Sequence, residues 1–316
     1  MPSTELLTPP APACDPVSDV PLDWPGFWLQ MLRARDGSYT PQLSHRPDGG
    51  WSVDGAVSAR TSALFDLYKP LLDARARQGR ARGDKPWVVA QLGQSLDGFV
   101  ATATGDSYYV NGAHCLLHLH RLRALCDAVL VGAGTVATDN PQLTTRRVPG
   151  PQPVRVVIDP AARLDGLSRV FRDGQAPTLW VCDGRHAAQA RARLHQAPAH
   201  ATVGAPHPAE VLAVDDLLAT DATAGYHPQP VVAALARRGL QPLFVEGGGI
   251  TVSRFFTAGA LDRLHLVVAP VLIGNGRRGL QAPAHAVMAD CPRPTARTLA
   301  LGLDMLWDLD LRPSQT

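Results

Sequence analysis

The chain has 316 residues, of which 45% are hydrophobic and 18% charged, with a formal net charge of +2. This length allows a large core and two structural units, and the composition is ordinary for a soluble globular protein. The balanced charge does not favour nucleic-acid or membrane-surface binding, and no apolar run reaches the ~18 residues of a transmembrane helix.

The N-terminal 85 residues precede the first clear strand. Residues 1–22 contain six prolines and no apolar h-region, so they are predicted to be a disordered tail rather than a secretory signal. Residues 23–85 are predicted to be an accessory helical segment that ends in a basic linker. Two stripes in it have helical spacing: Trp24, Phe27, Trp28, Met31 and Leu32, then Leu64, Leu67, Tyr68, Leu71 and Leu72, where Pro70 is a potential kink. Such stripes are typical of packing faces, against the remaining chain or a second subunit.

From Trp87 onward, short apolar runs alternate with helical patterns. Strands are predicted over 87–90, 128–131, 154–158, 178–181, 243–245 and 264–269, and 299–301 with 305–311 suggest a closing antiparallel pair. Helices are predicted over 111–126, 186–195, 231–239 and 250–259. The alternation predicts an α/β fold with a mostly parallel sheet, whose strands are apolar throughout because helices cover both faces.

The cysteines are five, scattered, and include no C-x-x-C pair. This predicts reduced thiols in a cytoplasmic protein rather than a disulfide scaffold or a zinc site. Cys115 and Cys126 are expected to be buried side chains that fill space in the core.

One glycine-rich loop follows the strand predicted over 128–131. Gly132, Gly134 and Ala137 match the G-x-G-x-x-G/A fingerprint of dinucleotide sites. That fingerprint requires a long helix next, but Pro141 follows at once, so an orthodox Rossmann site is not favoured. The loop can still offer backbone N–H groups and the Thr135 hydroxyl to a ligand.

A second glycine-rich loop, Glu246-Gly247-Gly248-Gly249, joins the strand at 243–245 to the helix at 250–259. Glycines at the positive end of a helix leave backbone N–H groups open to a phosphate. Glu246 adds a polar group at the carboxyl end of the strand, where open α/β sheets bind ligands. The alternative interpretation is a turn that only lets helix and strand pack closely.

Seven blocks, over residues 94–98, 104–107, 122–124, 132–146, 153–159, 245–248 and 269–274, recur in this order in one family. Together they resemble the reductase domain of riboflavin biosynthesis, the C-terminal domain of a bifunctional deaminase/reductase. The resemblance covers about residues 86–312, so residues 86–316 are assigned to this domain. The sequence has no H-x-E motif with a later P-C-x-x-C, so it predicts neither a zinc deaminase nor a metal site.

The resemblance implies a dihydrofolate-reductase-like α/β fold, with a mostly parallel central sheet, helices on both faces and an antiparallel C-terminal pair. It implies an NADPH-dependent oxidoreductase that reduces the ribosyl group of a phosphoribosylaminopyrimidine to ribityl, with hydride transfer to C1′. The implied partners are a small-molecule substrate and a second copy of the chain in a homodimer, without nucleic acid or membrane.

Site residues also follow from the resemblance. Glu246 is the catalytic candidate, and the substrate-binding positions are Ser107, Arg123, Leu143, Arg146 and Glu246. The cofactor-binding positions are Gly93, Tyr109, Thr135, Asp139, Gly248, Gly249, Ile250, Thr251, Val252, Ser253 and Arg254. Arginines can pair bidentately with a sugar phosphate, and a carboxylate can accept hydrogen bonds from ribose hydroxyls or pyrimidine N–H groups.

Simpler roles stay open for several of these residues. Arg123 is also compatible with a surface helix, Arg146 with a loop cation, and Asp139 with a turn. Asp97 is expected to be structural, holding its own turn. The histidines of the helix at 111–126 do not favour a metal site, because such sites recruit further ligands.

Four positions depart from the family pattern: Gln91 stands where lysine is usual, Tyr109 where tryptophan, Asn111 where threonine and Pro160 where serine is common. The cofactor loop is kept, whereas the substrate pocket is altered. Two alternatives therefore stay open. One is a reductase of the same fold for a pterin, folate-like or specialised-pathway heterocycle, and the other is a non-catalytic ligand-binding homologue.

Overall fold

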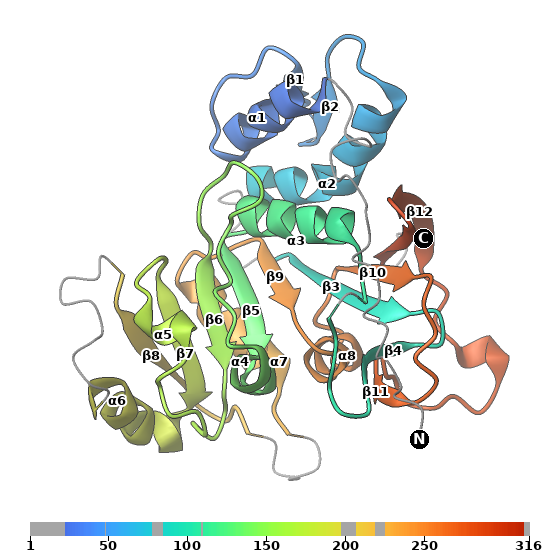
Figure 1. The fold of residues 1–316 in the computed structure, drawn as a ribbon. Helices are drawn as coiled ribbons and strands as arrows, with labels where there is room; N and C mark the ends of the chain where they lie inside the picture. The colour runs from blue at the N-terminus through green and yellow to red at the C-terminus, as the bar shows by residue number, and fades with distance from the viewer. Residues whose placement is uncertain are drawn as a thin grey trace, which may run out of the picture.

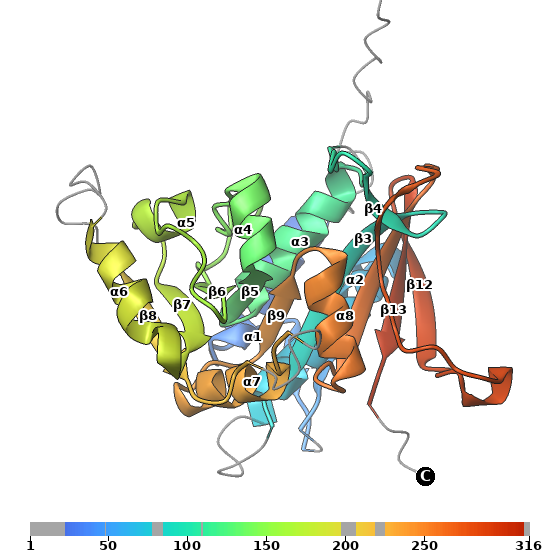
Figure 2. The same cartoon turned by 90° about the horizontal axis from the view of Figure 1, so that it is seen from below.

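The computed structural model describes residues 23–47, 49–77, 85–108, 110–196, 207–218 and 225–312. The predictions for the tail at 1–22, for Tyr109 and for residues 78–84 of the basic linker lie outside these residues. Within them, the α/β fold with a mostly parallel central sheet is confirmed (Figures 1 and 2).

The centre of the described structure is a nine-stranded sheet with the order β12-β13-β10-β3-β9-β5-β6-β7-β8. Its parallel part consists of β10 (Arg263–Ala269), β3 (Val88–Ser95), β9 (Leu243–Glu246), β5 (Ala128–Gly132), β6 (Val154–Ile158), β7 (Thr178–Asp183) and β8 (Ala209–Val214). At one edge, β13 (Asp304–Asp310) runs antiparallel to β10, and β12 (Thr295–Leu301) antiparallel to β13. The antiparallel C-terminal pair is therefore confirmed.

Successive side chains of the parallel strands enter two different cores. In β3, Val88, Ala90 and Leu92 pack in the core formed with α7 (Pro228–Arg237) and α8 (Gly249–Thr257). Val89 packs in the opposite core, which also contains residues of α3 (Ala113–Leu125), α5 (Arg169–Arg172) and α6 (Ala187–Gln196). Helices thus cover both faces, and this explains why the strands read as continuous apolar runs.

The helix after the first glycine loop is short, as its sequence requires. This helix, α4 (Ala133–Asp139), ends where Asn140 adopts a left-handed conformation with φ of 42°, and Pro141 follows. A proline there cannot continue the helix. The long helix of a Rossmann unit is absent from this stretch of described residues, as expected.

The accessory segment packs directly on α3. Its helices α1 (Trp24–Arg35) and α2 (Ala59–Arg77), with the β1 (Leu43–His45) and β2 (Trp51–Val53) hairpin between them, lie on the outer side of α3 (Figure 1). Both stripes are buried and share one hydrophobic core with the sheet, so they are packing faces, and α2 runs on through Pro70. The segment therefore packs against the remaining chain, which is one of the two partners that its sequence allowed.

Five strands of the described structure were not predicted. They are β1 and β2 of the accessory segment, β4 (Phe99–Thr102), β11 (Gly276–Arg278), which pairs with β4, and the half-exposed edge strand β8. Cys115, Cys126 and Cys182 are buried free thiols. No helix in the described ranges is both long and apolar enough to cross a membrane.

Candidate active site

A row of polar side chains crosses the sheet beneath α3. Strand register places Glu246 of β9 beside Gln91 of β3, Gln91 beside His265 of β10, and His265 beside Asp308 of β13. Residues paired side by side in a sheet share one face. These four side chains therefore form a polar layer between strands that are otherwise apolar and the helix above them.

Glu246 lies at the carboxyl end of β9 and forms a bidentate ion pair with Arg123 of α3. Arg123 donates from Nε to Oε2 at 2.8 Å and from Nη2 to Oε1 at 2.6 Å. Its Nη1 also donates to the Thr144 carbonyl oxygen at 2.8 Å, and the side chain is 5% exposed. Arg123 is therefore not a surface arginine. A carboxylate has about four lone-pair sites, so Glu246 keeps acceptor capacity for a ligand.

The loop after α4 brings Arg146 and Leu143 to the same place. The Arg146 backbone N–H donates to His120 Nδ1 at 3.0 Å, and its Nη1 donates to Thr144 Oγ1 at 2.8 Å. Leu143 is buried and has a φ of 57°, an uncommon conformation for leucine that costs about 1–3 kcal/mol. Packing and hydrogen bonds hold this loop in its strained form. His120 and Thr144 were not predicted; the signal for His120 was its position one helical turn before Arg123.

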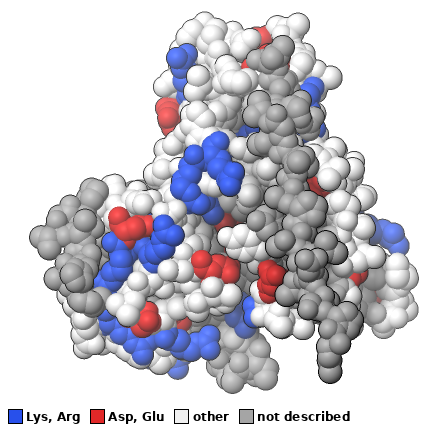
Figure 3. Space-filling view, in the orientation of Figure 1, with Lys and Arg blue, Asp and Glu red and all other residues white. Residues whose placement is uncertain are grey.

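Several arginines converge here with little negative charge to balance them. Burial, followed by the charge of Arg123, lowers the pKa of Arg146; Arg147 and Arg169 act in the same direction and Glu246 opposes them. Burial and the charges of Arg123 and Arg146 also lower the pKa of His120 to about 3. Among the described residues, no carboxylate forms an ion pair with Arg146, Arg147 or Arg169. Basic side chains gather on this face of the molecule (Figure 3). Such an excess of positive charge favours an anion such as a phosphate.

The two glycine loops face each other beside this cluster. A Cβ on Gly247 or Gly248 would lie 3.6 or 4.0 Å from Thr135 Oγ1, and one on Gly132 would lie 2.5 Å from Thr251 Oγ1. Gly248 caps the N-terminus of α8, and no other described atom lies within 4 Å of the position its Cβ would take. The helix end is thus open to an approaching phosphate.

Gly249 has a different role from Gly248. A Cβ on Gly249 would lie 2.4 Å from the Gly279 carbonyl oxygen and 2.5 Å from that of Arg278. Gly248 therefore leaves the helix end open, whereas Gly249 permits close packing.

The remaining predicted cofactor positions on α8 separate into two groups. Ile250 is 71% exposed at the open end, and Thr251 faces the other glycine loop. Val252 is buried in the core, the Gln281 backbone N–H donates to Ser253 Oγ at 2.8 Å, and Arg254 stacks over the Tyr226 ring at 4.9 Å. The structure thus brings 248–251 to the loop and turns 252–254 toward other parts of the chain.

Other predicted residues lie around this region without joining the hydrogen-bonded cluster. Asn111 fills the space above Gly93, where a Cβ would lie 1.9 Å from Asn111 Oδ1. Gln91 is buried and donates to Cys115 Sγ at 3.2 Å, while its Oε1 has no partner within the described structure. Ser107 and Asp139 are both exposed and hydrogen-bond to none of the described side chains of the cluster.

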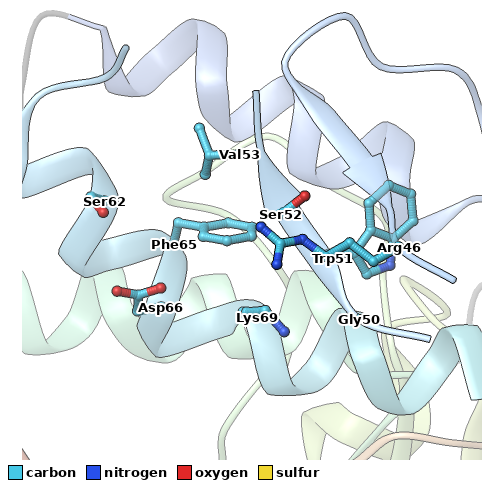
Figure 4. Close-up of a pocket in the computed structure, with 9 residues that line it drawn as sticks. All are labelled: Arg46, Gly50, Trp51, Ser52, Val53, Ser62, Phe65, Asp66 and Lys69. Atoms are coloured by element: carbon cyan, nitrogen blue, oxygen red, sulfur yellow. The ribbon is translucent and has the colours of Figure 1, made fainter. Parts of the chain in front are cut away.

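A separate recess of about 320 Å³ lies between β2 and α2 (Figure 4). It is lined by Arg46, Gly50, Trp51, Ser52, Val53, Ser62, Phe65, Asp66 and Lys69. None of these belongs to the glycine loops or to the arginine cluster, so the recess is distinct from the candidate active site. The described residues contain no group of three or more side chains suited to a metal ion.

Comparison with known proteins identifies a family and several relatives. The family model of the RibD C-terminal domain matches residues 86–290. The 2,5-diamino-6-ribosylamino-4(3H)-pyrimidinone 5′-phosphate reductase of Methanothermobacter thermautotrophicus is 32% identical over 228 residues, which are 70% of this chain and 96% of that protein. The riboflavin biosynthesis protein RibD of Bacillus amyloliquefaciens is 35% identical over 191 residues, which are 60% of this chain but only 47% of that protein.

Solved structures share the fold. Acinetobacter baumannii RibD superposes with a TM-score of 0.59 at 22% identity, over 79% of this chain and 63% of that chain. The Saccharomyces cerevisiae riboflavin biosynthesis reductase Rib7 gives a TM-score of 0.56 at 18% identity, over 78% of this chain and 98% of that chain. Because the family match extends over residues 86–290, and the archaeal relative is covered along 96% of its length, the chain belongs to the RibD C-terminal domain family.

Proposed function

We propose that this chain is an NADPH-dependent reductase that converts the ribosyl group of a ribosylaminopyrimidine 5′-phosphate into a ribityl group. The observation that carries the proposal is the position of the Glu246–Arg123 pair and the arginine cluster next to the open end of α8. The archaeal relative named as such a reductase matches along 96% of its length, which supports the same substrate class.

The described residues fit a dinucleotide phosphate. The N–H groups at the start of α8 and the Thr135 hydroxyl would hold the pyrophosphate, and Gly248 leaves room for it. When bound, the reduced nicotinamide supplies the hydride. The protein's own task is then to hold two ligands in reacting geometry and to stabilise charge.

The substrate phosphate is assigned to Arg146, with Arg147 and Arg169 contributing charge. Glu246 is assigned the ribose hydroxyls or the pyrimidine N–H groups through its remaining lone pairs. In the proposed reaction the C1′–O4′ bond opens, O4′ gains a proton and the exocyclic nitrogen loses one, which gives a C1′=N imine. Hydride addition to C1′ and protonation of the nitrogen then complete the reduction.

A reductase of the same fold for another heterocycle is the second candidate. Gln91 favours it, because this neutral, buried side chain replaces the lysine of the family pattern, and its Oε1 has no partner among the described residues. Oxidation of NADPH, followed by absorbance with the ribosylaminopyrimidine 5′-phosphate and with dihydropterins as separate substrates, distinguishes the two candidates. Turnover with neither would contradict both.

Arg146→Ala tests the substrate half of the proposal. We expect kcat/KM to fall by about 100-fold, equivalent to ~2.7 kcal/mol, with NADPH binding intact. Arg237→Ala, which removes an exposed arginine on α7, is the control and should keep wild-type kinetics. Glu246→Gln does not separate substrate binding from stability, because it leaves the buried Arg123 without its anion and destabilises the fold as well.

A homodimer is part of the proposal. The side of the β10–β13 sheet edge that faces away from α3 exposes Met305 and Trp307, which are 41% and 43% exposed, beside the half-buried Leu266 and Val268. Apolar surface of this kind on a sheet suits burial against a second copy. The cytoplasmic location expected from the cysteines stays a prediction.

A further inference from the structure

The accessory segment contacts the same two elements that carry the substrate residues. These elements are α3, which holds Arg123, and the loop at 141–153, which holds Leu143 and Arg146. The contacts between the described residues of this segment and the two elements do not include either glycine loop. The arrangement links residues 23–77 to the substrate half of the site rather than to the cofactor half.

The first link is a buried hydrogen-bond chain that starts at Tyr68 of α2. Tyr68 Oη lies 2.7 Å from His118 Nδ1, and His118 Nε2 lies 3.0 Å from His265 Nδ1. His265 Nε2 then lies 3.4 Å from Asp308 Oδ1, an electrostatic contact whose geometry is not that of a hydrogen bond. All four side chains are at most 2% exposed. The chain passes from the accessory segment through α3 to the polar row of the sheet.

The acidic end of this chain has a defined role. Burial alone would raise the pKa of Asp308, but the adjacent His265 and Arg263 side chains hold that pKa well below its usual range, so Asp308 is an acceptor. Burial, then the charge of His265, holds the pKa of His118 well below its usual range, so the His118 imidazole is neutral. A neutral imidazole has one nitrogen that donates and one that accepts, so His118 can bond to Tyr68 and to His265 at the same time.

The second link is between α1 and the loop at 141–153, called the substrate loop below. Trp28 Nε1 donates to the Pro149 carbonyl oxygen at 2.9 Å, three residues after Arg146. Leu32, one turn later, packs at Gly150, where an added Cβ would lie 3.5 Å from Leu32 Cδ2 and 2.6 Å from Ala124 Cβ. The loop is thus held between α1 and the last turn of α3.

The third link anchors the end of α3. Asp127, two residues after α3 ends, accepts from Arg75 of α2 and from Arg35 Nη2 at 3.1 Å. The Arg121 guanidinium stacks over the Trp24 ring at 5.0 Å, on the outer side of the same helix. Each of these contacts restrains α3 at a point close to Arg123.

From these contacts we infer that residues 23–77 position the substrate half of the site, with Tyr68 and Trp28 as the principal positioning residues. This inference rests on the proposed function, because it takes Arg123, Leu143 and Arg146 as substrate-binding residues. A segment without this role would affect stability only.

The test uses the full chain with Trp28→Phe and, separately, Tyr68→Phe. Both changes keep an aromatic ring. Tyr68→Phe removes only the hydroxyl group, whereas Trp28→Phe removes the indole N–H together with part of the ring, a loss that the Trp180→Phe control shares. We expect each to raise the KM for the ribosylaminopyrimidine phosphate about tenfold, the scale of one lost buried hydrogen bond. The increase in melting temperature caused by NADPH should be unchanged, because the glycine loops keep their contacts.

Two control variants separate positioning from stability. Thr61→Val removes a 2.7 Å bond from Thr61 Oγ1 to Asp23 inside the segment, so it should lower the melting temperature and leave KM unchanged. Trp180→Phe makes the same chemical change as Trp28→Phe at a buried indole whose Nε1 has no partner in the described structure, and it should leave KM unchanged. A wild-type KM in both Trp28→Phe and Tyr68→Phe overturns the inference.

Hydrogen exchange supplies a readout that needs no turnover. In Trp28→Phe, amides of residues 141–149 should exchange faster than in the wild type, while amides of residues 247–252 keep their rates. Unchanged exchange at 141–149 counts against positioning. If the wild type reduces no ribosylaminopyrimidine, the proposed function fails, and this exchange comparison still decides whether the segment holds the loop.

Discussion

At the scale of single residues, the adjacent glycines Gly248 and Gly249 differ in the space that is available for a side chain. A side chain on Gly249 would meet two carbonyl oxygens, whereas one on Gly248 would point into open space beside Thr135. Gly248 also has φ of −67° and ψ of 162°, a conformation that other residues adopt freely. The pair therefore allows ligand binding and folding to be tested separately.

NADPH should raise the melting temperature of the wild type, and Gly248→Val should fold but lose this increase. The added side chain occupies the approach to the helix N–H groups, and ligand binding to the native state is what produces the increase. Gly249→Ala should instead lower the melting temperature without any ligand. Thermal melts with and without NADPH give both results, and a normal NADPH response in a folded Gly248→Val would make the loop only a turn.

Asp97 is structural, as its sequence predicted, and it gives a pH-dependent signal. The Ser95 hydroxyl, together with the backbone N–H groups of Gly274 and Ile273, lowers the pKa of Asp97 to about 2 from its ordinary 3.8. Because the folded pKa is the lower one, the stabilisation is complete above pH 3.8 and is lost as the pH falls toward 2.

Asp97→Asn should therefore be less stable than the wild type by a constant amount at pH 7 and pH 5, and by a smaller amount near pH 3. Urea unfolding at the three pH values measures the difference. Asp290→Asn, at an exposed position of the described chain, serves as the control. A difference that stays constant down to pH 3 would show that the Asp97 charge does not hold this turn.

At the scale of elements, α3 is unusual because it is buried on two sides and is rich in polar residues. His118, His120, Arg121 and Arg123 are all buried. His118 and Arg123 contact the polar row of the sheet, and His120 contacts the loop at 141–153. Arg121 stacks on Trp24, while its Nε has no hydrogen-bond partner among the described residues. Most buried polar groups have partners of this kind. The helix thus transmits the position of the accessory segment to the site.

His118→Ala should lower the free energy of unfolding by about 3 kcal/mol, because it leaves a cavity and removes the partner of both Tyr68 and His265. Urea denaturation measures the change. His285→Ala alters an exposed histidine and should have little effect. Equal stabilities for the two variants would mean that the chain of hydrogen bonds contributes nothing to the fold.

At the scale of the whole molecule, the sheet has one edge where no helix of the described residues covers one of its faces. This face carries Trp307 and Met305 of β13, and it lies beyond α8 (Figure 2). The opposite face of the same strand is buried through Leu306 and Asp308. A strand that is buried on one side and apolar on the other fits the proposed homodimer.

Trp307→Lys should convert the dimer into a monomer, since a charge in an apolar interface has no partner there. Sedimentation velocity of both proteins measures the state. Leu167→Lys places the same charge at another exposed leucine and should leave the dimer intact. A monomeric wild type, or a dimeric Trp307→Lys, would contradict an interface on this face.

Local sequence determined most of the elements of this protein. The apolar runs at 128–131, 154–158 and 243–245 are strands, because side chains that are covered on both faces leave a signal in consecutive residues. The edge strand β8 left no such signal, because it is half exposed. The glycine loops and the end of α4 before Pro141 could also be predicted from local sequence, because they depend on backbone conformations that the residues at those positions impose.

Only the tertiary structure decided how the site is assembled. Glu246 and Arg123 are 123 residues apart in the chain, and their pairing depends on strand register and on the placement of α3 above the sheet. The stripes of α1 and α2 predicted packing faces without naming their partner, because periodicity describes one surface and not the surface that covers it. Tyr68, His118 and His265 became a chain for the same reason: each was an isolated polar residue until long-range packing excluded water and left them only one another as partners.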